Sequence, residues 1–98
     1  MQKAIAFTLG NLYITPGAIR TLHKNYTTGA EFLIRHLSGD WGDLSEEDKT
    51  SNNEALETGG RLLSAYLLKD ESKIWIITEA ADANGNRIAT TILLPEEY

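Results

Sequence analysis

The feature that most constrains the fold is a change of residue pattern at Gly59-Gly60. After it come three runs rich in Ile, Leu, Thr, Tyr and Trp, at residues 62–68, 73–78 and 88–94. Residues of these types favour β-strands. Short polar segments separate the runs, and Asn84-Gly85, before the third run, is a strong signal for a β-hairpin. The second half of the chain therefore predicts a three-stranded antiparallel β-meander.

The first half predicts three short helices, which cover residues 16–24, 28–38 and 45–58. The first starts at Thr15-Pro16, because threonine can cap a helix and proline is tolerated at the first helical position. Thr28 and Glu31 have the spacing of a capping box, and Gly39 ends that helix. Ser45 opens the third helix, which is polar. An extended segment precedes all three, at residues 4–9 or at 12–14.

These elements predict one domain of the α+β class over residues 1–98, since no linker rich in Gly, Ser or Pro divides the chain. Its architecture is an N-terminal extended segment and three short helices packed on the C-terminal meander. The run at residues 73–78 is apolar on both faces, which indicates cover on both sides. The helices would supply one cover, and a dimer partner or the N-terminal strand the other. A monomer and a homodimer both fit the pattern.

The composition restricts which metal sites and cross-links the chain can form and in which cell compartment we expect it. The chain has no cysteine, which excludes disulfides and thiolate zinc sites. The apolar run at the N-terminus is too short for a signal peptide, and no segment approaches the roughly 20 apolar residues that span a bilayer. We therefore expect a cytoplasmic protein that has no membrane contact and no cofactor.

The charge is distributed unevenly. Residues 40–57 contain seven carboxylates and one lysine, Lys49, while the chain as a whole has a net charge of −5. This acidic stretch opens with the sequence His36-Leu-Ser-Gly-Asp-Trp-Gly42. Local negative potential of this kind suits a basic partner, and it disfavours nucleic acid, whose binding depends on Lys and Arg. We expect a protein partner that has a basic surface and no direct binding of nucleic acid.

Catalytic candidates are few. His36 falls in the last turn of the second predicted helix, four residues before Asp40, whose carboxylate could orient the ring. Arg61 and Glu79 could join His36 in a small nuclease, although nothing in their spacing requires them to meet. His36, Asp40 and Asp43 could bind a divalent ion, but aspartates beside glycine more often form turns, so no metal site is predicted. The ordinary interpretation of His36 is a residue that interacts with the helix dipole.

Trp41 lies between Asp40 and Gly42, where no helical or strand period would bury it. It either plugs the loop against the core or is exposed as an anchor of a protein interface. The predicted binding surface is formed by the carboxylates of this segment together with the indole: Asp40, Trp41, Asp43, Glu46, Glu47 and Asp48. The alternative for its helical part is an ordinary solvated face.

The order of five motifs resembles a known family. They are Leu12 to Gly17, His36 to Gly42, Gly60 to Tyr66, Lys73 to Ala80 and Ala89 to Tyr98. Together they are similar to small proteins of plasmids, phages and integrated elements, often labelled "plasmid related protein" and sometimes a type I restriction subunit. The resemblance spans nearly the whole chain and implies no activity and no catalytic residue. This chain departs from the family at Ala81 to Ile88, which forms a longer turn.

The resemblance implies a mobile-element context, in which small accessory proteins often inhibit host defences. The leading hypothesis is a non-enzymatic inhibitor or adaptor, of the anti-restriction or anti-CRISPR type, that binds a host protein. The alternatives are an enzyme or toxin acting on a nucleotide or nucleic acid through His36, and a protein that sequesters a small molecule. An exposed carboxylate face would favour the first, a cleft that holds His36 with Arg61 or Glu79 the second, and an apolar pocket with convergent polar groups the third.

Overall fold

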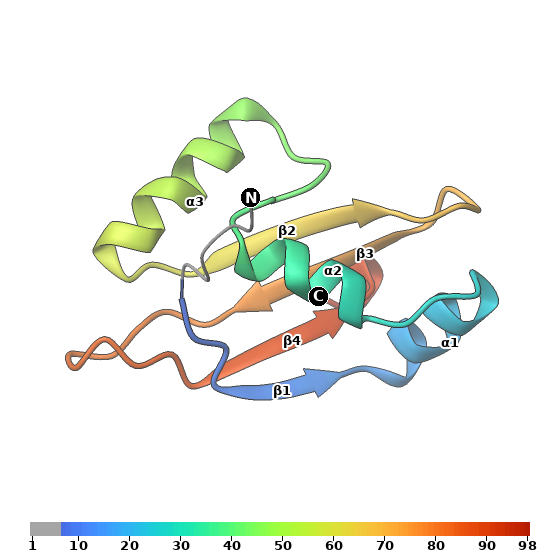
Figure 1. Cartoon of the computed structure of the whole chain (residues 1–98), viewed down its shortest axis with the longest axis horizontal. Helices are drawn as coiled ribbons and strands as arrows, with labels where there is room; N and C mark the ends of the chain where they lie inside the picture. Colours follow the sequence, from blue (N-terminus) through green and yellow to red (C-terminus); the bar gives the residue numbers. More distant parts are fainter. Residues whose placement is uncertain (1–6) are drawn as a thin grey trace.

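The computed structural model describes residues 7–98, which form three helices beside one sheet (Figure 1). In chain order the elements are β1 (Asn11–Ile14), α1 (Pro16–Lys24), α2 (Ala30–Leu37), α3 (Glu46–Thr58), β2 (Leu62–Leu67), β3 (Lys73–Thr78), β4 (Ala89–Leu93) and the 3-10 helix η1 (Pro95–Glu97). The α+β class is as predicted.

The sheet has four strands in the order β1-β4-β3-β2. β2, β3 and β4 pair antiparallel in sequence order, as the meander predicts. β1 is the difference, because it pairs with β4 and runs parallel to it. The prediction of a purely antiparallel three-stranded sheet was therefore wrong, and the sheet is mixed and four-stranded.

The position of β1 shows which of the two predicted N-terminal segments, residues 4–9 or 12–14, forms a strand. The strand covers Asn11–Ile14 and so includes residues 12–14. The other candidate, residues 4–9, falls partly on residues 4–6, which lie outside the described part of the chain. A strand of four residues carries too little pattern for its partner to be read from the sequence. Its pairing with β4 is decided by tertiary packing, since the two strands are far apart in the chain.

The helix starts follow local chemistry in two of three cases. Thr15 caps α1 by accepting a hydrogen bond from the Ala18 backbone at 3.1 Å, and Ser45 caps α3 through Asp48 N at 3.1 Å. The capping box expected at Thr28 does not form, because α2 begins one residue later than that box requires, with Gly29 as its N-cap. The Glu31 carboxylate instead accepts a hydrogen bond from the Thr27 hydroxyl at 2.5 Å.

The helices cover one face of the sheet. Ile74, Ile76 and Ile92 point to that face and pack with residues of α1 and α2, while Leu62 packs under Trp41 and Ala55 of α3. Strand alternation places Trp75 on the other face, where the Tyr98 ring meets it edge-on at 5.7 Å. Within residues 7–98 none of the α-helices covers that second face, and the C-terminal segment that contains η1 packs there through Tyr98.

Candidate functional site

His36 lies in the last turn of α2, as the sequence places it, but its ring is fully buried. Nδ1 is 2.5 Å from Ser64 Oγ of β2, and Nε2 is 2.9 Å from Thr78 Oγ1 of β3. Asp40, the carboxylate expected to orient the ring, instead forms an ion pair with Arg35 at 2.7 Å. Two hydroxyls therefore orient the imidazole, and the ring ties α2 to two strands of the sheet.

Counting donors fixes the direction of this hydrogen-bond chain. Thr90 Oγ1 donates its only proton to the Leu9 carbonyl at 2.8 Å, so the 2.8 Å contact between Thr78 and Thr90 must use the Thr78 proton. Thr78 then has no proton left for His36, and Nε2–H must donate to it. In a neutral ring Nδ1 is consequently the acceptor, and Ser64 donates to it. The core thus contains a directed chain of hydrogen bonds that ends on a backbone carbonyl.

This arrangement opposes protonation of His36. Burial, with a smaller contribution from the positive charge of Arg87, lowers the pKa of His36 from 6.5 to about 4. A proton on Nδ1 would also require the Ser64 hydroxyl, which donates to that atom, to turn and accept instead. The imidazole is therefore neutral at physiological pH, and it is sealed from solvent.

The three catalytic candidates do not meet in a cleft. His36 is buried within the hydrogen-bond chain, whereas Arg61 and Glu79 are exposed. The guanidinium of Arg61 donates to the Tyr98 hydroxyl and lies 5.3 Å from that ring. Tyr98 packs on Trp75, so Arg61 reaches the face of the sheet opposite the helices. This geometry gives no route by which a substrate would touch the imidazole.

Arg87 is a buried cation that the sequence analysis did not single out, apart from its place in the longer turn. Its Nη1 donates to the carbonyls of Gly60 at 2.7 Å and Glu79 at 3.0 Å, and its Nη2 donates to Ala55 O at 3.2 Å. Burial lowers the pKa of this guanidinium. Ala55 lies in the last turn of α3, where the helix dipole favours a cation. Arg87 thus joins the turn between β3 and β4 to the end of α3.

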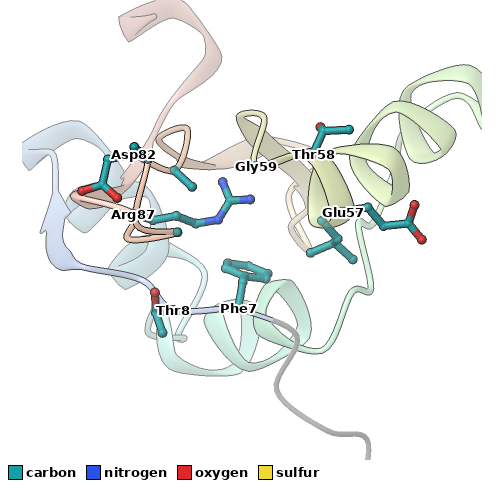
Figure 2. A pocket seen from close by; sticks show the side chains of 11 residues that line it. Phe7, Thr8, Glu57, Thr58, Gly59, Asp82 and Arg87 are labelled. Carbon is teal, nitrogen blue, oxygen red and sulfur yellow. The ribbon is translucent and has the colours of Figure 1, made fainter.

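A cavity of about 410 Å³ opens beside Arg87 (Figure 2). In Figure 2 the Phe7 ring and the Arg87 side chain face each other across it, while the Glu57 carboxylate points outward. Asp82, which also lines it, uses Oδ1 to accept the backbone N–H groups of Asn84 and Asn86, both at 2.9 Å. Two charged groups of the cavity, Arg87 and Asp82, are therefore engaged in capping the helix and closing the turn.

The predicted acidic surface lies on the loop before α3 and on its first turn. Asp43, Glu46, Glu47 and Asp48 are all exposed, and Asp40 is half-buried. Two of these carboxylates form further surface ion pairs, Asp43 with Lys73 at 3.2 Å and Glu46 with Lys49 at 3.8 Å. Exposed pairs of this kind are weak, so the surface keeps its negative potential. The acids of the first turn also lie where the helix dipole favours them.

Trp41 lies beneath this surface and is 4% exposed. Its Nε1 donates to Asn53 Oδ1 of α3 at 3.0 Å, and its ring packs with His36 and Phe7. Of the two predictions for Trp41, the structure agrees with a side chain that packs against the core. It does not agree with an exposed anchor of a protein interface. A groove of about 340 Å³ nevertheless opens above it, between Asp40 on the loop and Glu46 and Lys49 on α3.

His36, Asp40 and Asp43 do not form a ligand set. Both ring nitrogens of His36 face hydroxyls, and the carboxylates of Asp40 and Asp43 turn to Arg35 and Lys73. Across residues 7–98 no group of three or more His, Cys, Asp or Glu side chains is arranged to hold a metal ion. Within the same range no helix is both long and apolar enough to cross a membrane.

Comparison of the chain with protein families, with curated proteins and with solved structures found no match. The residues of the structure itself therefore carry the functional argument.

Sequence reasoning missed several buried polar residues: Asn52, Ser64, Thr78, Arg87 and Thr90. A signal for three of them was present. Ser64, Thr78 and Thr90 occupy strand positions whose alternate neighbours, Leu62, Ile76 and Ile92, are core residues. A polar residue on the apolar face of a strand needs a buried partner, and His36 is the polar side chain within reach.

Proposed function

We propose that this chain is a non-enzymatic accessory protein that binds a basic surface of a host protein through its acidic surface. That surface comprises Asp40, Asp43, Glu46, Glu47 and Asp48. The resemblance of its five sequence motifs to small proteins of mobile elements is the reason to propose that the host protein belongs to a defence system, and that binding inhibits it in the anti-restriction or anti-CRISPR manner.

The observation that carries the proposal is the groove between Asp40 and the first turns of α3. Carboxylates of two separate elements border it, with Lys49 beside Glu46, and the buried indole of Trp41 forms part of its lining. Such a groove suits the long stem and charged end of a lysine or arginine from the partner. The role of Trp41 is then to support the groove from below, because its own burial keeps it from inserting into a partner.

The enzyme and sequestration alternatives receive less support. The imidazole of His36 is enclosed by Ser64 and Thr78, and Arg61 extends to another face of the molecule. In the cavity at Arg87, the guanidinium already donates to three backbone carbonyls of the chain. An acidic face open to solvent is the arrangement that favours a protein partner.

The test compares capture of host proteins by two sets of charge changes. In the test variant Glu46→Gln, Glu47→Gln and Asp48→Asn remove the charges while keeping the side-chain size and the Ser45 cap. The control variant changes three exposed acids elsewhere, Glu71→Gln, Glu79→Gln and Glu96→Gln. Circular dichroism establishes that both variants fold.

The captured partner is identified by mass spectrometry and its association kinetics are measured over a range of salt. The test variant should associate about tenfold more slowly or worse, and lose most of its salt dependence. Screening explains the second effect, because the Debye length falls from about 10 Å at 0.1 M salt to about 3 Å at 1 M. Equal rates for the test variant and wild type would show that α3 presents a solvated face only.

A further inference from the structure

The outer edge of β1 is open in the described part of the chain, since β1 is the end strand of the sheet. Asn11 N donates to Ile88 O at 2.9 Å and Thr15 N to Ile92 O at 3.0 Å, so odd-numbered residues bond to β4. Alternate residues of a strand direct their backbone groups to opposite sides. Leu12 and Ile14 therefore turn their N–H and C=O groups away from the sheet. In Figure 1 no element lies beyond β1 on that side.

The opposite edge of the same sheet is closed by the chain itself. Asn52 of α3 uses its side-chain amide to bond both backbone groups of Leu63, with distances of 2.7 and 3.1 Å. Ala65 N donates to Trp41 O at 3.1 Å, and Ala65 O accepts from Asp43 N at 2.6 Å. The free backbone groups in the middle of β2 are thus satisfied by an amide side chain and a short loop.

Apart from its short length of four residues, β1 lacks the features that usually protect an edge strand. Its four residues, Asn11-Leu-Tyr-Ile14, include no charge, no proline and no bulge. Three of the four side chains, Leu12, Tyr13 and Ile14, are apolar or aromatic, and they remain accessible, with Leu12 50% and Tyr13 54% exposed. An uncharged apolar edge of this kind is a template for a further strand.

We propose that this edge binds the same edge of a second copy, forming a symmetric dimer with one continuous eight-stranded sheet. The outward backbone groups of both Leu12 and Ile14 find partners within β1 only when these two residues pair with each other. Leu12 of one copy would form a hydrogen-bonded pair with Ile14 of the other, twice about the two-fold axis, and each pair exchanges both N–H···O=C bonds. The two Tyr13 residues would then face each other on the axis.

The side chains match this register, which is the reason to choose a second copy as the occupant. It places each Leu12 beside an Ile14 and stacks two tyrosines, so all the paired side chains at its centre are apolar or aromatic. No charge is buried, and the same patch serves both copies, as a two-fold interface requires.

The charge distribution permits the same arrangement. The segment from Phe7 to Lys24 contains only the cations Arg20 and Lys24 and no carboxylate, whereas seven of the fourteen acids lie in residues 40–57, on and before α3. β1 and β2 are opposite edges of the sheet, and α3 packs beside β2. A β1-to-β1 dimer therefore keeps the two acidic helices at its outer ends, where their repulsion is weakest. The inference does not depend on the acidic partner proposed above.

The first test measures the mass of the full chain by analytical ultracentrifugation over a concentration series. Wild type should shift from the monomer mass to twice that value as concentration rises. Tyr13→Lys places two ammonium groups opposite each other and should abolish the shift. Leu67→Lys is the matched control, because Leu67 is also 54% exposed and lies on β2, at the closed edge. The control should dimerise as wild type does.

A second test does not depend on how Tyr13→Lys folds. The chain lacks cysteine, so Tyr13→Cys introduces a single thiol. Residues that face each other without hydrogen bonds lie about 4.5 Å apart at Cα, within the range that a disulfide bridges. Mild oxidation should link Tyr13→Cys chains much faster than Leu67→Cys chains.

Three results would overturn the proposal. The first is a wild type that stays monomeric throughout the series, which would leave the edge to a strand of another protein. The second is a dimer that persists in Tyr13→Lys, and the third is equal rates of oxidation for the two cysteine variants. Either of these would place the contact elsewhere.

Discussion

The two edges of the sheet meet the same physical problem in different ways. Every strand edge presents backbone donors and acceptors, and leaving them bare exposes the protein to association. At β2 the Asn52 amide and the loop at Trp41 to Asp43 bond these groups, and α3 packs beside them. At β1, within residues 7–98, the strand pairs only on its inner side, with β4. One edge is thus part of the folded core, and the other is the surface at which we propose that a second copy binds.

The comparison predicts that changes at the closed edge cost stability, while changes at the open edge alter association. The largest effect is expected for Trp41→Ala. It removes a buried indole and loosens the backbone that bonds Ala65, so the free energy of unfolding should fall by about 3–5 kcal/mol. Urea denaturation measures it. Trp75→Ala is the control, since Trp75 is only half-buried, and it should cost clearly less. Equal losses would mean that the loop does not contribute to closing the edge.

The next effect is expected for Asn52→Ala. Asn52 is 4% exposed, and its amide is the partner of both Leu63 backbone groups. Unsatisfied buried groups cost about 1–3 kcal/mol each, so the loss should be about 3 kcal/mol. Hydrogen exchange at the Leu63 amide should also accelerate. Ser51→Ala, at an exposed position of the same helix, should leave both measurements almost unchanged.

Acid should lower the free energy of unfolding, because His36, which joins α2 to β2 and β3, is neutral in the folded protein. The folded pKa of about 4 lies below the ordinary 6.5, so the unfolded chain binds the proton more tightly. The stabilisation is complete above the unfolded pKa and is lost as pH falls toward the folded one. From about pH 7 to about pH 5 the free energy of unfolding should drop by about 2 kcal/mol. Urea midpoints at several pH values measure this change. His36→Gln should remove most of the dependence of the urea midpoint on pH. An unchanged dependence would contradict the assignment of this effect to His36.

The smallest effect on the stability of the monomer is expected at the open edge. Tyr13→Lys changes a side chain that is half exposed and has no hydrogen bond to the rest of the fold in the described residues. Measured at a concentration where the protein is monomeric, its unfolding free energy should stay within about 0.5 kcal/mol of wild type. A loss as large as that of Asn52→Ala would show that the β1 edge is as integral to the core as the β2 edge.

The sequence by itself determined the local structure. The strands at residues 62–68, 73–78 and 88–94, the caps at Thr15 and Ser45 and the left-handed stop at Gly59 follow from residue type and short-range geometry. The second helix shows the limit of this reasoning, because Thr27 competes for Glu31 and the capping box does not form. Local patterns predict where an element lies more reliably than which neighbour satisfies it.

Only the tertiary structure decided the partners across the chain. β1 joins β4, and Asn52, His36 and Arg87 each bond to residues that lie 8 to 42 positions away. The sequence does not show which polar side chains are buried. An asparagine on a polar helix is expected to face solvent, and only the position of β2 beside α3 shows that Asn52 is buried. Trp41 is the same case, since the loop alone does not tell whether its indole faces the core. The residue types set what each group needs, and the packing of distant segments decides what supplies it.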